Sequence, residues 1–277
     1  MKTVDQQRKN VLSEKIEKAK QQYEKAFSLF RPEETRLIWS GGKDSTLMVW
    51  ICLQYCREKK VEVPPVFTID EFDTFEEIDE FLKRYAEEWN LSLDWGRNDD
   101  VLEAAGHTLG NDVKVADLNE RNRAEIKRIG FDLELFPFEA ESYVGNHLMK
   151  TVVFNRYIEE NGVKAVFQGI RWDEQEARKY DEYFEEAAGD EFTSPHTRVR
   201  PILHFTERDV WDTTHGFGIP YCTLYEQGYR SLGAKTTSVK SVETPAWEQD
   251  LENTEERAGR RQDKEQAMER LRKLGYM

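Results

Sequence analysis

The stretch SGGKDS, residues 40–45, constrains the fold of this chain more than any other, because it joins two apolar runs without a spacer. The run before it, residues 37–39, has the length and apolar character of a short buried strand. The run after it lies in a segment that predicts a helix over residues 44–58, apolar on nearly all sides. A buried strand that turns directly into a buried helix is typical of an α/β fold.

The composition of this turn suits an anion. Gly41 and Gly42 leave room for a ligand close to the backbone, where a Cβ would clash. The first N–H groups of a helix have no partner within the helix, and the positive end of its dipole lies there. The turn also supplies hydroxyl donors and one mobile positive charge: Ser40, Lys43, Ser45 and Thr46. It therefore predicts a binding site for a phosphate or pyrophosphate.

Two features separate this turn from the common G-x-x-x-x-G-K-[ST] nucleotide loop. That loop needs four residues between its glycines and a lysine before serine or threonine, whereas here the glycines are adjacent and Lys43 precedes Asp44. A carboxylate is an unusual direct contact for a phosphate, so Asp44 is better explained as a cap of the helix or as an indirect magnesium ligand. The alternative is a glycine-rich turn that caps the helix and binds nothing.

The order of the other apolar segments predicts an open sheet. Strands are expected at residues 66–69, 91–95 and 163–167, with an extended segment at 131–135. Helices are expected at residues 5–30, 76–89, 118–129 and 142–161. This alternation predicts a Rossmann-like α/β fold, in which an open, mostly parallel five-stranded sheet carries helices on both faces. An N-terminal helix, residues 1–35, and a charged, helical C-terminal tail, residues 241–277, flank it.

The charge balance argues against binding to nucleic acid or to a membrane surface. Lys and Arg number 40 and Asp and Glu number 54, so the formal net charge is −14. No apolar run approaches the ~20 residues of a membrane span, and the N-terminus lacks the apolar core of a signal peptide. The three cysteines, Cys52, Cys56 and Cys222, fit a reducing compartment, and none of the five histidines has metal-ligand spacing with another histidine or cysteine. We expect a cytoplasmic protein.

Four stretches give the chain a resemblance to a known family. LIWSGGKDSTLMVW, residues 37–50, resembles the pyrophosphate loop (PP-loop) of the ATP pyrophosphatase superfamily, and within it the chain resembles the phosphoadenosine phosphosulfate (PAPS) reductase family. That group includes the ATP sulfurylase small subunit and the eukaryotic-type FAD synthetases. The other stretches are FTIDEFDTFEEIDEF at 67–81, LMKT at 148–151 with VFQGIRWDEQEAR at 166–178, and residues 200–237. In the last, IPYCTLYEQGYRSLG is especially similar to the FAD synthetase version.

The resemblance implies a fold of the adenine nucleotide alpha hydrolase type and a site for ATP, or for a phosphosulfate adenine nucleotide. Lys43, Asp44 and Arg171 are then the implied catalytic residues. Asp70, or its rival Asp73, would meet the adenosine, and Asp44 or Asp70 would hold Mg²⁺. The implied nucleotide contacts are Ser40, Gly41, Gly42, Lys43, Asp44, Ser45, Asp70, Gly169, Arg171, Arg178, Gln227, Gly228, Tyr229, Ser231 and Gly233. For Arg171 and Arg178 the alternative is pairing with neighbouring carboxylates.

The reductive chemistry of this family needs a cysteine that this chain does not supply. The reductases carry a nucleophilic cysteine in a Glu-Cys-Gly-type motif near the C-terminus, and residues 238–277 contain no cysteine. The resemblance therefore favours cleavage of the α–β bond of ATP, with adenylyl transfer to an acceptor and with Mg²⁺. Sulfate is the first candidate acceptor, from LMKT and GIRWDE, and FMN is the second, from IPYCTLYEQGYRSLG.

Other functions stay open at this stage. A PAPS reductase that lacks the usual cysteine, or a non-catalytic nucleotide-binding subunit, would carry the same loop, although the intact Lys43, Asp44 and Arg171 favour an enzyme. The expected ligands are a nucleotide and an anionic acceptor, and the expected assembly is a homodimer or a complex with a partner subunit. We expect a catalytic domain over residues 36–240. Within it, residues 96–140 resemble neither the ATP sulfurylase small subunit nor the FAD synthetases, and we expect them to shape the acceptor pocket.

Overall fold

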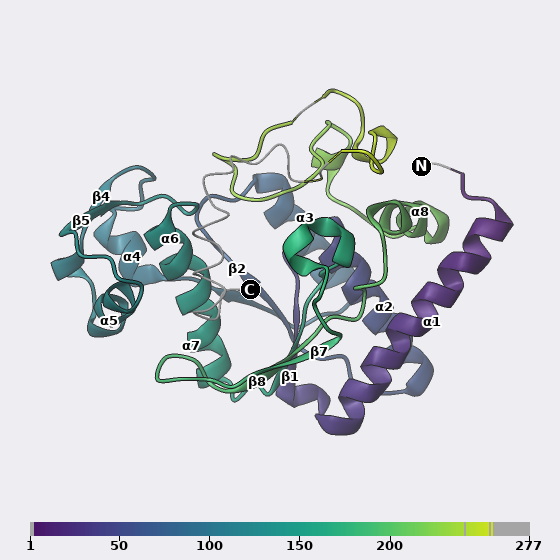
Figure 1. Cartoon of the computed structure of the whole chain (residues 1–277), viewed down its shortest axis with the longest axis horizontal. Helices are drawn as coiled ribbons and strands as arrows, with labels where there is room; N and C mark the ends of the chain where they lie inside the picture. The colour runs from purple at the N-terminus through teal and green to yellow at the C-terminus, as the bar shows by residue number, and fades with distance from the viewer. Residues whose placement is uncertain (1–2, 241, 255, 257–277) are drawn as a thin grey trace.

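The computed structural model of the chain describes residues 3–240, 242–254 and 256 (Figure 1). In these described ranges, no helix is both long enough and apolar enough to cross a membrane. The helix expected in the C-terminal tail falls on residues outside them. The division of the chain at residues 36 and 240 stays a prediction.

A central sheet confirms the α/β fold. Its six strands lie in the order β3-β2-β1-β6-β8-β7. The bounds are β1 Thr35–Ile38, β2 Val66–Ile69, β3 Leu93–Gly96, β6 Ala165–Phe167, β7 Phe184–Ala187 and β8 His196–Val199. From β3 to β8, each pair of neighbouring strands is parallel. In β1, for example, Leu37 lies opposite Val66 of β2 and Phe167 of β6. The strand β7 pairs antiparallel with β8 at the edge.

Helices cover both faces of the sheet, and the alternation of side chains along the strands assigns each helix to a face. Val66 and Phe167 pack in one hydrophobic cluster with α1 (Gln6–Leu29), α2 (Lys43–Lys59), α3 (Glu76–Glu88) and α8 (Glu207–Phe217). The adjacent residues Phe67 and Val166 point the other way and pack with α7 (Val153–Glu160). In Figure 1, α7 lies on one side of the sheet, and α1 and α8 lie on the other.

The helix α1 forms where the spacing of apolar residues predicts it. Asp5 caps its start, because the side-chain carboxylate accepts the N–H of Arg8 at 2.8 Å. The buried residues Leu12, Ile16, Ala19, Tyr23 and Ala26 are spaced by three or four and face α2 and α8. The hydroxyl of Tyr23 donates to the carbonyl of Met48 at 2.7 Å, which ties α1 to the helix that follows the SGGKDS loop.

The segment that follows β3 has its own hydrophobic cluster. It contains α4 (Asp99–Ala104), β4 (Asp112–Lys114), α5 (Glu120–Arg128), β5 (Leu135–Pro137) and α6 (Tyr143–Asn146). The strands β4 and β5 form a separate antiparallel pair. The helix expected over residues 142–161 is present, but its middle, His147–Val152, is a π-helix that contains the LMKT stretch.

The sheet differs from the expectation in its outer strands. It has six strands rather than five, and the extended segment expected at residues 131–135 is wrong, because β5 begins only at Leu135 and belongs to the small second sheet. Two strands of the sheet, β7 and β8, were not predicted. The strand β7 begins in a polar stretch, residues 170–186, whose sequence shows no core face. Half-buried polar side chains are usual on an edge strand, so the apolar pattern that reveals a central strand is weak there.

Candidate active site

The SGGKDS loop leaves β1 at the carboxyl end of the sheet and enters α2 directly. Gly41 has a φ of +73°, which favours glycine, and a Cβ there would approach Ile78 Cγ2 within 2.8 Å. Gly42 is the N-cap of α2 and provides no side-chain cap. The expectation that Asp44 caps this helix is therefore wrong. The N–H of Lys43 donates to the hydroxyl of Tyr225 at 2.9 Å, so the late segment of the chain reaches the loop.

The hydroxyls of the loop hold its shape. Ser45 donates from Oγ to the carbonyl of Gly42 at 3.0 Å, and it also accepts the N–H of Ser40 at 3.3 Å. Thr46 accepts the indole N–H of Trp39 at 2.9 Å, which fixes the first turn of α2 against β1. The backbone of the loop is thus set before any ligand binds.

Lys43 and Arg171 bring two positive charges together at the start of α2. Lys43 is 2% exposed and Arg171 is 0% exposed. The Nζ of Lys43 lies 2.5 Å from Oε1 of Glu256 and 3.2 Å from Oδ2 of Asp44. Arg171 donates from Nη2 to Oε2 of Glu256 at 2.5 Å and from Nε to Oδ1 of Asp173 at 2.8 Å. Its Nη1 pairs with Asp44.

The surrounding charges favour the ionised forms of Lys43 and Glu256. Burial alone would lower the pKa of Lys43, but Asp44, Glu256 and Glu207 outweigh it, so the pKa of Lys43 lies above its ordinary value. Burial alone would raise the pKa of Glu256, but Lys43 and Arg171 outweigh it and lower that pKa below its ordinary range. A buried cation pair of this kind is suited to bind an anion with several oxygens.

Arg230, Glu207 and Glu256 extend the cluster and were missed in the sequence. Arg230 donates to both carboxylate oxygens of Glu207, from Nη2 to Oε2 at 2.7 Å and from Nε to Oε1 at 3.2 Å. Glu207 in turn lies 3.8 Å from Nζ of Lys43. Only Arg230 carried a signal, because it stands inside LYEQGYRSLG. Glu207 and Glu256 come from acidic segments in which no spacing distinguishes one carboxylate from another.

A cavity of about 180 Å³ lies beside the loop, at the carboxyl ends of β1 and β2. This is the edge of an open α/β sheet at which ligands bind. Its apolar walls include Ile38, Trp39, Ile69, Ile78, Leu82 and Trp95. Its charged lining comprises Glu71, Asp73, Asp79 and Lys150, and Nζ of Lys150 is paired with Glu71 at 2.8 Å and with Glu141 at 3.1 Å.

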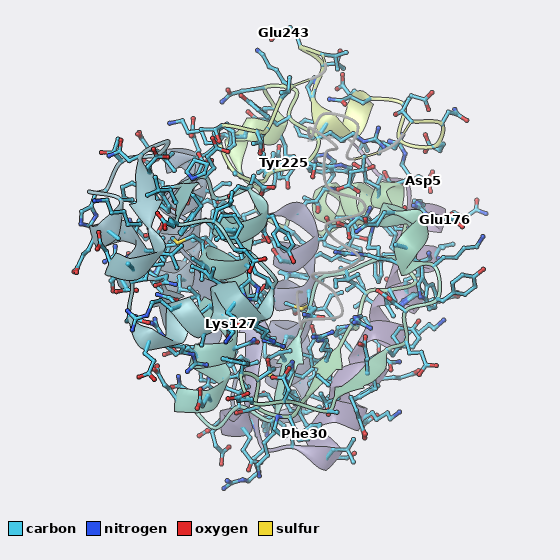
Figure 2. All side chains as sticks on the ribbon, turned by 60° about the vertical axis from the view of Figure 1, so that its left-hand side comes forward. Asp5, Phe30, Lys127, Glu176, Tyr225 and Glu243 are labelled. Carbon is cyan, nitrogen blue, oxygen red and sulfur yellow. The ribbon has the colours of Figure 1, made fainter. Side chains whose placement is uncertain are left out.

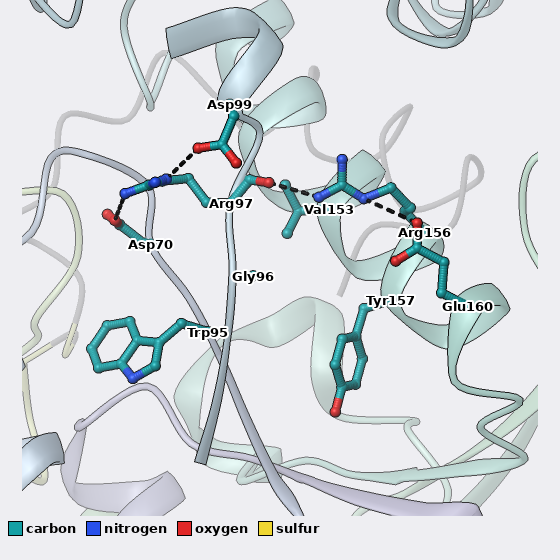
Figure 3. Close-up of a pocket in the computed structure, with 9 residues that line it drawn as sticks. All are labelled: Asp70, Trp95, Gly96, Arg97, Asp99, Val153, Arg156, Tyr157 and Glu160. Carbon is teal, nitrogen blue, oxygen red and sulfur yellow. Dashed lines mark hydrogen bonds and ion pairs between the residues drawn. The ribbon is translucent and has the colours of Figure 1, made fainter.

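The two candidate aspartates, Asp70 and Asp73, line different cavities. Asp73 lines the cavity beside the loop, and its carboxylate accepts the N–H of Thr236 at 3.1 Å, which fixes the late segment over the cavity. Asp70 instead accepts the N–H of Phe72 at 2.9 Å and lies 3.6 Å from Nη1 of Arg97. It lines a second cavity of about 330 Å³ (Figure 3). The geometry therefore favours Asp73 over Asp70 as the aspartate at the loop-side cavity.

The second cavity is bounded by β3 and α7, and its charged side chains pair with one another (Figure 3). Arg97 donates to Asp99 at 2.6 Å, and Arg156 donates to the carbonyl of Arg97 at 2.7 Å. Trp95 lines both cavities and forms part of the wall between them. This cavity contains none of the residues of the loop.

The glycines expected to meet the nucleotide have clear structural reasons. A Cβ on Gly169 would lie 2.6 Å from Cα and 2.7 Å from N of Ser45, so only glycine lets β6 approach the loop this closely. Gly228 has a φ of +96°, and a Cβ there would lie 1.8 Å from the carbonyl oxygen of Val242. Gly233 lines the loop-side cavity. Gly169 and Gly228 thus allow close backbone approaches, to the loop and to the segment above it respectively.

The other predicted contacts are spread more widely. Tyr229 packs edge-on against Phe75, with 5.2 Å between ring centroids, Ser231 is half-buried, and Gln227 is exposed. Arg178 pairs with Glu174, as the alternative of local pairing predicts. Figure 2 shows Tyr225 well inside the molecule and Glu243 at the outer end of the late segment. Among the residues the structure describes, no group of three or more His, Cys, Asp or Glu could hold a metal ion.

Comparison with known proteins gives a match to one family model over most of the chain. The family model described as "Phosphoadenosine phosphosulfate reductase domain" matches residues 34–240. A probable FAD synthase of Caenorhabditis elegans is 54% identical over 43 residues, which cover 16% of this chain and 8% of that protein. A probable FAD synthase of Schizosaccharomyces pombe is 22% identical over 223 residues, 76% of this chain and 62% of that protein. Sulfate adenylyltransferase subunit 2 of Chelativorans sp. is 26% identical over 208 residues, 68% and 59% respectively. These matches span less than two thirds of the length of each relative.

Solved structures show the same fold. Yeast FAD synthetase in complex with FAD superposes with a TM-score of 0.62 at 17% identity and covers 94% of this chain and 93% of that one. The PAPS reductase of Candida auris superposes with a TM-score of 0.56 at 17% identity, over 86% and 99% of the two chains. At these identities the superpositions establish the fold alone.

Proposed function

This chain belongs to the phosphoadenosine phosphosulfate reductase domain family, and we propose that it is a PP-loop nucleotidyltransferase that transfers the adenylyl group of ATP to an anionic acceptor. The observation that carries the proposal is the buried pair Lys43 and Arg171 at the start of α2, beside a cavity with apolar walls. The cavity suits a nucleoside, and the cation pair at the start of a helix suits its phosphates.

The proposed reaction is an in-line displacement at the α-phosphorus. An oxygen of the acceptor forms a bond to this phosphorus while the bond between the α-phosphorus and the bridging oxygen breaks, and the electron pair leaves with pyrophosphate. Lys43 and Arg171 neutralise the charge that develops on the leaving pyrophosphate. An acceptor phosphate is already largely ionised at neutral pH, so no protein group has to remove a proton.

The charge of the loop-side cavity supports ATP rather than a nucleotide with a phosphate on its ribose. Three carboxylates, Glu71, Asp73 and Asp79, line it, and its lysine is already paired with two glutamates. Burial, and to a lesser extent the negative charge of the nearby Asp70, raise the pKa of Asp79. An additional phosphate would meet like charge there, whereas ribose hydroxyls and an adenine amino group can donate to carboxylates.

Cys222 gives no support to a reductase. Its side chain is buried, and burial raises the pKa of its thiol to about 11, so very little thiolate forms at neutral pH. A nucleophilic cysteine needs the opposite environment. Together with the lack of cysteine in residues 238–277, this argues against reductive cleavage of a sulfonucleotide.

FMN is the acceptor that we propose first. The late segment IPYCTLYEQGYRSLG resembles the FAD synthetase motif, and probable FAD synthases are among the curated relatives. Sulfate is the second candidate, because LMKT forms the π-helix beside the loop-side cavity and a sulfate adenylyltransferase subunit is also a relative. A short π-helical segment inside a helix is frequent at functional sites.

The assembly of the protein, as a homodimer or with a partner subunit, stays a prediction.

Mg²⁺ would accompany the triphosphate. In nucleotide sites it binds one or two carboxylates and otherwise water and phosphate oxygens, so a cage of protein ligands is not needed. Asp44 lies at the loop and fits this role, although its oxygens pair with Arg171 and Lys43. Asp70 lines the other cavity and fits it less well. When bound, Mg²⁺ would supply further neutralisation of phosphate charge.

The test is an assay of the full chain with Mg²⁺ and ATP. One arm adds FMN, a second adds sulfate, and a third adds neither. We expect pyrophosphate and FAD in equal amounts when FMN is present, measured by a coupled pyrophosphate assay and by chromatography. Pyrophosphate only with sulfate would favour the second candidate. No pyrophosphate in any arm, while ATP binds in a calorimeter, would overturn adenylyl transfer and leave a nucleotide-binding protein.

A further inference from the structure

The carboxylate of Glu256 lies between Lys43 and Arg171 and contacts both cations. Its Oε1 lies 2.5 Å from Nζ of Lys43, and its Oε2 accepts from Nη2 of Arg171 at 2.5 Å. Two oxygens on one centre, each held by a different cation, reproduce the way in which two oxygens of a phosphate would be held. Glu256 is only 9% exposed, so solvent does not separate it from the cations.

The charge count shows that the cluster is already saturated. Its cations are Lys43, Arg171 and Arg230, and its carboxylates are Asp44, Asp173, Glu207 and Glu256. With Glu256 in place, four negative charges face three positive ones, so a triphosphate would meet a site of the same sign. Without Glu256 the charges balance at three each, and the two cations regain unused donors. An incoming phosphate therefore has to displace Glu256.

The residues before Glu256 are anchored to the cluster by two arginines, Arg230 and Arg208. Arg230 donates to the carbonyl of Asp250 at 3.3 Å, of Leu251 at 3.3 Å and of Thr254 at 3.0 Å. Arg208 donates to the carbonyl of Trp247 at 2.9 Å, and Trp247 packs in the main hydrophobic cluster. A tethered carboxylate held this close has a high effective concentration at the cation pair.

We propose that Glu256 is an internal competitor of the nucleotide phosphates, so that the C-terminal segment autoinhibits the site until it is displaced. The inference rests on the proposed function, because it takes Lys43 and Arg171 to be the phosphate-binding pair. Only the fraction of molecules with Glu256 displaced is competent to bind, so the apparent affinity is reduced by that fraction. Removal of the carboxylate raises the competent fraction.

The experiment compares the wild-type full chain with Glu256→Gln and Glu256→Ala, and uses inorganic pyrophosphate and Mg²⁺–ATP as probes in isothermal titration calorimetry. The glutamine keeps the shape but not the charge, and the alanine serves if the glutamine variant does not fold, as checked by thermal melting. The matched control is Glu243→Gln, an exposed carboxylate of the same segment that pairs with Lys240. We expect both probes to bind Glu256→Gln at least about tenfold more tightly, while Glu243→Gln binds like the wild type.

The outcomes separate this inference from the proposed function. Equal or weaker binding by both Glu256 variants, with the wild type binding normally, overturns autoinhibition and leaves adenylyl transfer standing. Weaker binding of Mg²⁺–ATP alone also overturns it, since Glu256 would then assist the nucleotide. Failure of the wild type and both variants to bind either probe overturns the phosphate site and with it the proposed function.

Discussion

Gly169 lies so close to Ser45 that a Cβ at position 169 would come within 2.6 Å of Ser45 Cα. The neighbour is backbone at the first turn of α2, which cannot swing away as the end of a side chain can. The end of β6 is thus pressed against the loop, and Arg171 follows two residues later. This contact places Arg171, which follows β6, beside Lys43 at the start of α2.

Gly169→Ala should therefore separate β6 from the loop. We expect the free energy of unfolding to fall by about 1–3 kcal/mol, the usual cost of forcing a group into a packed site, as measured by urea denaturation. Binding of ATP should weaken as well, because Lys43 and Arg171 move apart. The matched control is Gly216→Ala in α8, where the nearest atom to a new Cβ lies at 3.5 Å and alanine favours the helix. A Gly169→Ala protein as stable as this control would contradict the close contact.

Lys43→Met should destabilise the fold even without ligand. The change leaves the buried carboxylates Asp44, Glu207 and Glu256 with less compensation, and loss of one partner of a buried ion pair costs about 3–5 kcal/mol. Chemical denaturation measures the effect, and adding Glu256→Gln should restore part of the loss because it removes one unpaired charge. The control, Lys59→Met on the exposed pair with Glu24, should change stability by less than about 1 kcal/mol. Equal effects at positions 43 and 59 would contradict a charged cluster.

Arg171→Lys should impair turnover more than binding of the nucleoside part. A lysine at this position keeps the charge but cannot contact the leaving pyrophosphate through a planar fork. We expect kcat for pyrophosphate release to fall about 10²–10³-fold, as for the loss of one donor to transition-state charge, and AMP binding to change little. The exposed Arg31→Lys, which pairs with Glu33 and Glu34, is the control and should leave kcat unchanged. A full kcat in Arg171→Lys would remove this arginine from the reaction.

The wild-type protein should discriminate against a phosphorylated ribose. We expect AMP to bind at least about tenfold more tightly than adenosine 3′,5′-bisphosphate, since an unscreened like charge at a few ångströms costs more than 1 kcal/mol near a protein surface. Asp79 lines the cavity, and its Oδ1 has no hydrogen-bond partner among the described residues. Asp79→Asn should narrow the difference between the two ligands in calorimetry. Tighter binding of the bisphosphate to wild type would instead favour a phosphosulfate nucleotide.

The stability of the protein should fall in mildly acidic solution. Burial lowers the pKa of His204 to about 4, from an ordinary value near 6.5. The unfolded chain therefore binds a proton in the range between these values while the folded chain does not, so the free energy of unfolding decreases as pH falls from about 6.5 to 4. His204 contacts the carbonyl of Lys15 at 2.9 Å and the hydroxyl of Tyr183 at 3.1 Å. Thermal melting of His204→Gln against pH should give a flatter curve than the wild type, and an identical slope would assign the pH dependence to other groups.

The sequence determined the features that depend on neighbours in the chain. The apolar runs around SGGKDS set the strand-to-helix turn, and the spacing of Leu12 to Ala26 set α1, because a strand or helix buries one periodic face. The two adjacent glycines and Lys43 indicated an anion site for the same local reason. Arg171 was found from the motif that contains it.

Only the tertiary structure decided which charges meet. Glu207 and Glu256 belong to acidic segments whose sequences look like solvated surface, and they reach Lys43 because α8 and the C-terminal segment pack over the loop. The same holds for Asp70 and Asp73, three residues apart in the chain, which the turn after β2 directs into different cavities. Pairing of charges across a fold depends on long-range packing, and residue type and spacing contain no record of it.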